Sequence, residues 1–99
     1  MLIPNELKQK LPAIYSTQNE KDPIVKLKFF NPYGSGTWYL MEYDPEENLA
    51  FGYVDLGSAE LGYFSITELE SINLPYGLKI ERDEYFEPCY LSEVNLEKV

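Results

Sequence analysis

The sequence predicts an α+β domain, in which a small antiparallel sheet of three to five strands, connected as a meander, carries two or three short helices. Short alternations of apolar and polar residues recur between turn signals that contain glycine and proline. After Ser65 the apolar spacing changes from a period of two to a helical period. The aromatic share is 15%, with nine tyrosines, a composition that favours strands.

The totals indicate one globular unit. The 99 residues are expected to form a single domain, residues 1–99, and the 44% hydrophobic and 25% charged shares are typical of a folded core. A lone cysteine, Cys89, excludes an internal disulfide and gives no support for a secreted scaffold. No basic-then-apolar leader is seen, and no apolar run approaches the ~20 residues that span a bilayer. We therefore expect a soluble cytoplasmic protein.

The N-terminal segment predicts a short helix. Pro4 suits the first helical position, and Leu7, Leu11 and Ile14 then recur near one face. Pro12 is expected to end or kink this helix.

Four strands are predicted next, after a polar loop at residues 16–23. Residues 24–30 form the first, with Val25, Leu27 and Phe29 expected on one face. The later strands are residues 38–43, 49–55 and 61–64, separated by turns at 31–36, 44–48 and 57–59.

A second helix is predicted at residues 66–72. Ser65 and Glu68 have the spacing of a capping box, and Ile66 and Leu69 follow at helical intervals. The remaining expectations are a turn at 74–77, a last strand at 78–82, an irregular tail and one helical turn at 91–94.

Most catalytic and metal-binding chemistries lack the residues they need. The chain has no histidine, which excludes Ser-His-Asp and Cys-His sites. Cys89 lies near acids that disfavour a thiolate. The glycines at 34 and 36 fit a turn better than a phosphate cradle, and the acids of residues 44–48 lack the rest of a calcium loop. We expect no catalytic residues, no metal site and no cofactor.

The charges are unevenly distributed. The net charge of −9 disfavours direct binding of nucleic acid or of an anionic membrane. Residues 29–78 contain eight acids and no lysine or arginine. In the predicted sheet these acids fall at strand ends and turns, so we expect them to gather along one rim.

Two interpretations of this rim are open. The acids can be a solvated face that keeps an aromatic-rich sheet soluble. Alternatively, carboxylates and tyrosines form a docking surface for a basic partner, as in proteins that mimic DNA. The predicted contact residues are Glu42, Asp44, Glu46, Glu47, Asp55, Glu60, Tyr39, Tyr43 and Tyr53. If Trp38, Leu40 and Phe51 face the core, then Tyr39 and Tyr43 face outward, but the sequence alone leaves this parity open.

Two other functions stay open. One is a small enzyme or a module that binds a nucleotide or other small ligand. A concave site that combines converging carboxylates with Arg82 would favour it, whereas a convex acidic ridge favours protein binding. The other is a structural subunit, for which an exposed apolar patch at residues 85–86 and 90–91 would be evidence.

Motifs along nearly the whole chain resemble a family of small bacterial and phage proteins, the domain-of-unknown-function family numbered two-nine-five-eight. They are LIPNEL at residues 2–7, LPAIY at 11–15, DPIV at 22–25, KFF at 28–30, TWY at 37–39, FGYV at 51–54, GYFSITELE at 62–70, LKIERD at 78–83 and LSEV at 91–94.

The resemblance implies a single-domain, acidic, cytoplasmic protein without a known activity or established catalytic residues. It also implies carriage on plasmids, integrative elements and phages, often near antirestriction-type genes. From these observations we expect a non-enzymatic accessory or counter-defence protein that binds a basic protein of the host or of the mobile element. The oligomeric state is left open.

Overall fold

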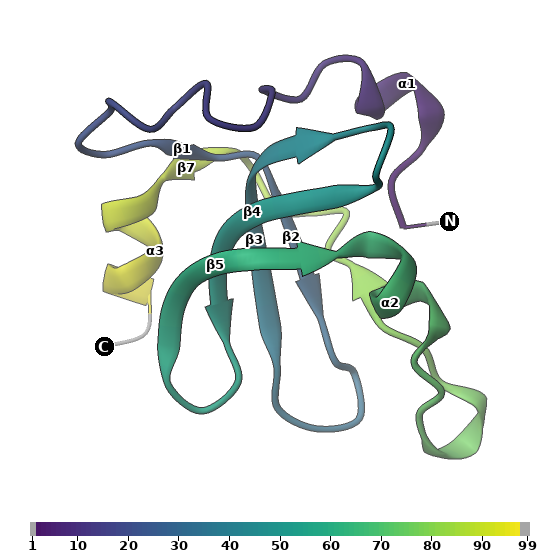
Figure 1. Ribbon diagram of the computed structural model, residues 1–99. Coiled ribbons are helices and arrows are strands. Elements are labelled where there is room, and N and C mark those ends of the chain that lie inside the picture. Colours follow the sequence, from purple (N-terminus) through teal and green to yellow (C-terminus); the bar gives the residue numbers. More distant parts are fainter. Residues whose placement is uncertain (1, 98–99) are drawn as a thin grey trace.

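The computed structural model describes residues 2–97 and shows one five-stranded antiparallel sheet with the strand order β5-β4-β3-β2-β6 (Figure 1). A separate two-stranded sheet joins β1 to β7. The strands are β1 (Ile24–Val25), β2 (Leu27–Phe30), β3 (Thr37–Asp44), β4 (Leu49–Asp55), β5 (Ala59–Ser65), β6 (Glu81–Arg82) and β7 (Cys89–Tyr90). The helices are α1 (Asn5–Lys8), α2 (Ile66–Ser71), the 3₁₀ turn η1 (Pro75–Gly77) and α3 (Leu91–Glu97). The predicted α+β class is confirmed.

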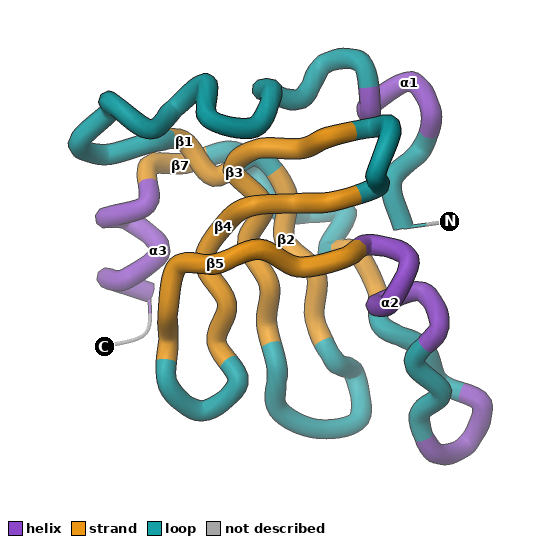
Figure 2. Tube along the Cα trace, in the orientation of Figure 1, coloured by secondary structure: helices purple, strands orange, loops and turns teal. Residues whose placement is uncertain are grey.

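The meander from β2 to β5 follows the local signals that predicted it. Each hairpin joins neighbouring antiparallel strands, and Figure 2 shows the connecting turns at the two ends of the sheet. At the start of α2 the Ser65 Oγ accepts a hydrogen bond from the Glu68 backbone N–H at 3.2 Å. This contact satisfies one of the donors that a helix leaves free at its first turn, so the predicted N-cap is confirmed.

The prediction of one continuous strand at residues 24–30 is wrong. The chain breaks at Lys26, so β1 pairs with β7 and only β2 joins the main sheet. Lys26 donates its backbone N–H to the Leu40 carbonyl oxygen at 2.8 Å, outside both ladders. Because of the break, side chains before and after Lys26 no longer alternate in register between the two faces. Val25 therefore packs in a different apolar cluster from Phe29.

The C-terminal third is more ordered than the sequence predicts. The expected strand at 78–82 is reduced to β6, which pairs with β2, while Ile80 packs in the core without strand geometry. The tail expected to be irregular supplies β7, and the helical turn expected at 91–94 is the beginning of the longer helix α3. Both depend on contacts with β1 and the sheet, which are distant in sequence.

A β-bulge in β3 sets which residues each face presents. Leu40 lies opposite Gly52, but Glu42 lies opposite Phe51, so Met41 is the extra residue. Beyond the bulge the alternation of β3 shifts by one position. Tyr43 therefore packs on the same face as Leu40, although an unbroken strand would place the two residues on opposite faces.

The two faces of the sheet carry separate apolar cores. The first is closed by the N-terminal segment, by α2 and by Ile80, and its buried residues are Leu2, Ile3, Phe29, Trp38, Leu40, Tyr43, Ala50, Ile66, Leu69 and Ile80. The second lies under α3 and Phe86, and its buried residues are Val25, Tyr39, Met41 and Val94. Because β3 is covered on both sides, it forms the centre of the fold.

The bulge predicts unequal effects of alanine at two strand glycines. A Cβ on Gly52 would lie 1.7 Å from the Tyr39 carbonyl oxygen, whereas a Cβ on Gly62 would meet no atom within 4 Å. We expect Gly52→Ala to lower the free energy of unfolding by about 3 kcal/mol or to prevent folding. The control Gly62→Ala should be neutral or stabilising by up to about 1 kcal/mol. Urea unfolding of both variants at low protein concentration measures the difference, and equal effects would contradict this geometry.

Candidate protein-binding surface

Glu42, a predicted contact residue, is an internal anchor. Its exposed fraction is only 2%, because the bulge turns the side chain beneath the N-terminal loop. Oε1 accepts the Tyr15 backbone N–H at 2.8 Å, and Oε2 accepts the Thr17 backbone N–H at 2.9 Å together with the Thr17 hydroxyl. The structure therefore removes Glu42 from the set of residues that a partner can contact.

Tyr39 and Tyr43 are also buried, so neither ring is available as a surface anchor. Tyr39 packs in the second core, with its ring centroid 6.2 Å from that of Phe86. Tyr43 enters the first core through the bulge and donates its hydroxyl to Asn48. Burial raises the pKa of Tyr43, and the charges of nearby acids raise it further. The sequence left open which faces these side chains occupy, and the structure shows that Tyr39 and Tyr43 are buried on opposite faces of the sheet.

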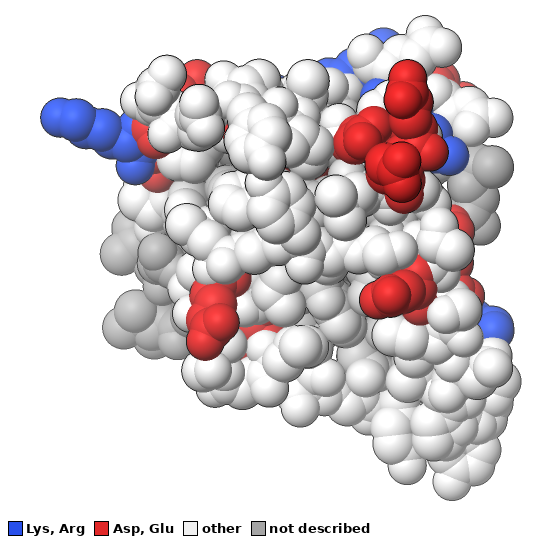
Figure 3. Space-filling view, viewed as in Figure 1, with Lys and Arg blue, Asp and Glu red and all other residues white. Residues whose placement is uncertain are grey.

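The remaining predicted acids form two groups instead of one rim. Asp44, Glu46 and Glu47 lie at the β3–β4 turn, and Asp55 and Glu60 lie at the other end of β4. The length of β4 separates the groups by about 20 Å. Figure 3 shows acidic groups (red) near the borders of the viewed face and uncharged residues (white) across its centre. Within these groups Glu46, Glu47 and Glu60 are exposed, while Asp44 and Asp55 are half-buried.

A patch of apolar and aromatic side chains lies between the two acidic groups. We call it the aromatic patch, and it consists of Tyr15, Phe51, Tyr53, Leu61 and Tyr63. Its most exposed members are Tyr15 (65%), Leu61 (54%) and Tyr63 (49%). Across β4 and β5, Phe51 pairs with Tyr63 and Tyr53 pairs with Leu61, so these four side chains share one face of the sheet. The predicted anchor Tyr53 therefore belongs to this patch.

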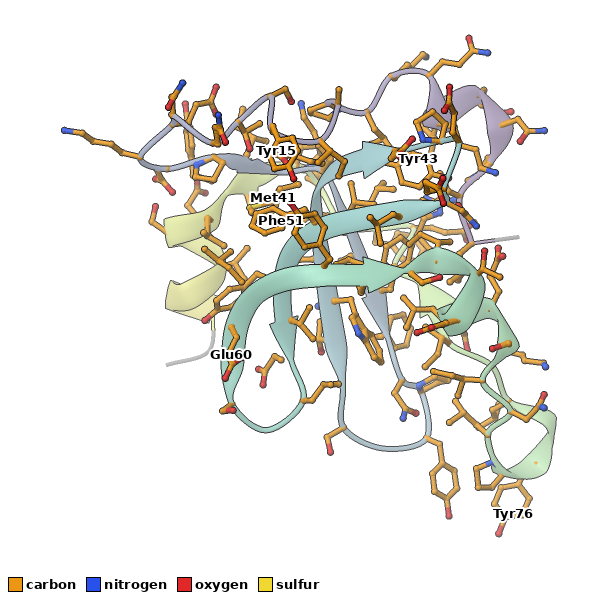
Figure 4. The ribbon with its side chains drawn as sticks, in the orientation of Figure 1. Tyr15, Met41, Tyr43, Phe51, Glu60 and Tyr76 are labelled. Atoms are coloured by element: carbon orange, nitrogen blue, oxygen red, sulfur yellow. The ribbon has the colours of Figure 1, made fainter. Side chains whose placement is uncertain are left out.

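Tyr15 reaches the patch from the N-terminal loop. Figure 4 shows its side chain over the sheet near Met41 and Phe51. A side-chain hydrogen-bonding interaction with Tyr15 raises the pKa of Tyr63, so the two tyrosine side chains lie next to each other. The Tyr63 ring in turn lies 4.9 Å, centroid to centroid, from the Phe51 ring. The rings of the loop, β5 and β4 thus form one continuous surface.

The loop that carries Tyr15 is held in a strained conformation. Tyr15 has φ = 71°, in the left-handed region that costs a residue other than glycine on the order of 1 kcal/mol. The two backbone hydrogen bonds to Glu42 offset this cost, because they fix the loop on both sides of Ser16. A buried carboxylate therefore orders an exposed aromatic side chain.

Four residues of this surface are absent from the predicted contact residues, namely Tyr15, Phe51, Leu61 and Tyr63. Leu61 and Tyr63 alternate around Gly62, which is a signal that both side chains share a face. Their exposure follows from the position of β5 at the edge of the sheet, and the sequence predicted no strand order beyond the meander.

A second feature is a depression of about 490 Å³ beside β6. It contains Arg82 together with acids, as the ligand-binding alternative requires, and is lined by Leu2, Glu70, Lys79, Ile80, Glu81, Arg82 and Glu84. Its charges are partly engaged, since Arg82 Nη2 lies 3.6 Å from Glu84 Oε1 and the Glu70 carboxylate accepts the Leu2 backbone N–H at 2.7 Å.

The C-terminal tail exposes less apolar surface than the structural-subunit alternative needs. Tyr85 is 94% exposed and Tyr90 is 51% exposed, but Phe86 and Leu91 pack against the second core.

Two kinds of feature are absent from the described part of the chain. No helix among these residues is both long enough and apolar enough to cross a membrane. Within the same residues, no three or more cysteine, aspartate or glutamate side chains are grouped so that they could hold a metal ion.

Comparison with known proteins gives one match. Residues 2–95 match the model of a family described as a protein of unknown function, DUF2958. No curated protein and no solved structure matches the chain.

The Glu42 anchor gives a testable prediction. Glu42→Gln replaces one acceptor oxygen with a donor amide, which leaves at least one of the hydrogen-bond donors of the loop unmatched. We expect the free energy of unfolding to fall by about 1–3 kcal/mol. The amides of Tyr15 and Thr17 should also exchange faster with solvent in NMR spectra. The control Glu46→Gln, at an exposed position, should stay within about 0.5 kcal/mol of wild type. Unchanged exchange at both amides in Glu42→Gln would show that the carboxylate does not hold the loop.

Proposed function

The chain belongs to this DUF2958 family, and we propose that it is a non-enzymatic module that binds a basic protein. In this proposal the aromatic patch forms the centre of the contact, and the two acidic groups border it.

The observation that carries the proposal is that the patch is exposed and yet rigidly held. Monomeric proteins rarely expose clusters of large apolar side chains unless these bind something. Here Tyr15 is fixed through Glu42, and Tyr63 packs on Phe51. Rigid tyrosines lose little conformational entropy on binding, and they are enriched among the residues that dominate interface energies.

The acidic groups define the chemistry of the partner. The exposed Glu46, Glu47 and Glu60 would meet lysine and arginine side chains placed around an apolar contact. Such a charge arrangement speeds encounter and rejects acidic partners more than it adds affinity. A nucleic-acid-binding protein of the host or of a mobile element presents such lysine and arginine side chains. An accessory or counter-defence role by DNA-mimic-like docking is therefore part of the proposal.

The aromatic centre is tested with tagged wild-type protein and Tyr63→Ala in pull-downs from the natural host's lysate. We expect one dominant basic partner with wild type and at least about tenfold less of it with Tyr63→Ala. The matched control is Tyr76→Ala, which removes a 90% exposed tyrosine at the distant tip seen in Figure 4 and should capture the partner normally. Equal capture by wild type and Tyr63→Ala would remove the aromatic patch from the proposal.

The acidic border is tested by the double variant Glu46→Lys with Glu47→Lys. Both side chains are exposed in a turn, so we expect the fold to be unchanged and the affinity to fall about 3- to 10-fold at low salt. The difference should shrink at high salt, because the ions screen the lost attraction. An unchanged affinity at low salt would contradict a role for this acidic group.

The depression beside β6 supports a second candidate, the binding of a small ligand. Arg82 is its strongest anchoring group, since a guanidinium can bind a carboxylate or phosphate through two hydrogen bonds. A thermal-shift screen of nucleotides and small carboxylates, repeated with Arg82→Gln, tests this candidate. A ligand that stabilises wild type and not Arg82→Gln would support it, whereas no stabilisation by any compound would count against it.

A further inference from the structure

We propose that two copies of this chain associate by pairing their β5 strands in antiparallel fashion about a two-fold axis at Gly62. The result would be one continuous sheet across the dimer. This inference does not rest on the proposed basic partner, because it is argued from the backbone groups at the edge of the sheet, although Leu61 and Tyr63 also belong to the aromatic patch.

β5 is a long edge strand without the usual protection. Its seven residues pair with β4 on one side only, and the register between the two strands has no bulge. Natural edge strands avoid pairing through lysine, proline, bulges or short length. The sequence AELGYFS has no lysine or proline and a single charge, Glu60, near its start.

The backbone groups that face outward belong to the odd-numbered residues. Ile66 donates its N–H to the Asn48 carbonyl at 2.9 Å, and this pair continues the β4–β5 register. Hydrogen-bonded pairs alternate along an antiparallel ladder, so Gly62 and its even-numbered neighbours direct their N–H and C=O groups toward β4. Leu61 and Tyr63 direct theirs away from β4.

A two-fold axis at Gly62 matches these free groups. Leu61 then lies opposite Tyr63 of the second copy, and each pair exchanges both of its backbone hydrogen bonds. The two Gly62 residues form the central pair without hydrogen bonds, where the Cα atoms approach most closely, to about 4.5 Å. Glycine suits this position, since no Cβ has to fit at the axis and the surrounding space is open.

The side chains fit the same register. Leu61 and Tyr63 lie on one face and are about half exposed, so cross-strand contact between copies covers apolar surface. Glu60 lies opposite Phe64 of the second copy instead of another acid. The two Glu60 residues are offset by four positions, about 14 Å along the strands, which is beyond the screening distance of about 8 Å at physiological salt. The two aromatic patches would merge on one face of the joined sheet.

The overall charge sets the expected salt dependence. Each chain carries a net charge of −9, so two copies repel one another at low salt. Added salt should therefore strengthen self-association, whereas it should weaken the binding of a basic partner. Because salt has opposite effects on the two kinds of binding, failure of the dimer and failure of the proposed function can be told apart.

Sedimentation velocity of wild-type protein between about 20 and 500 µM, a range suited to a small interface, tests the inference. We expect a monomer–dimer equilibrium that shifts several-fold toward dimer in high salt. A monomer at every concentration and salt would overturn the proposal, and so would association that weakens with salt.

NMR exchange on the wild-type chain locates the contact without any variant. The amide protons of Leu61 and Tyr63 should exchange more slowly as the concentration rises, while that of Gly62, which faces β4, should not change. Concentration-dependent protection elsewhere, with none at Leu61 and Tyr63, would assign the dimer to another surface.

A pair of variants separates backbone pairing from apolar contact. Leu61→Pro removes an outward N–H that β4 does not use, so the fold should persist and the dimer should be lost. Leu61→Thr keeps that N–H and a strand-favouring side chain, and it should retain dimer with an affinity reduced only a few-fold. Full dimerisation of a folded Leu61→Pro protein would contradict pairing through β5.

Discussion

The extra residue in β3 controls both faces of this small sheet. At the bulge, Met41 shifts the alternation of the strand, which turns Glu42 toward the N-terminal loop and brings Tyr43 into the first core. Gly52 on the neighbouring strand makes the arrangement possible, because its missing side chain leaves room for the Tyr39 carbonyl. One local irregularity therefore links the packing of the core to the position of the loop that carries Tyr15.

Local signals in the sequence predicted most of the elements. The Ser65 cap, the hairpin turns and the meander all depend on residues close together in the chain, and the structure contains each of them. The break at Lys26 and the pairing of β1 with β7 depend on segments about 65 residues apart. A local pattern cannot report such pairings, which is why the sequence predicts a helical turn at 91–94 but no strand at residues 89–90.

The candidate surface shows the same division. Turn composition predicted that Glu46 and Glu47 are exposed, and they are. The bulge places Glu42 and Tyr43 inside the protein, and no residue pattern in the sequence predicts that bulge. The exposure of Leu61 and Tyr63 depends on the strand order, which places β5 at the edge of the sheet. The exposed acids of residues 29–78 thus border the candidate surface, and the centre of that surface consists of uncharged side chains.

Glu42 holds the loop in place and Tyr15 lies against Tyr63, so that loop and sheet form one surface. Nuclear Overhauser effects between the two tyrosine rings, recorded for dilute wild-type protein and for Glu42→Gln, test it directly. We expect clear ring-to-ring effects in wild type and their loss in Glu42→Gln, with the β4–β5 contacts retained in both. Absence of the effects in wild type, or their persistence in the folded variant, would contradict it.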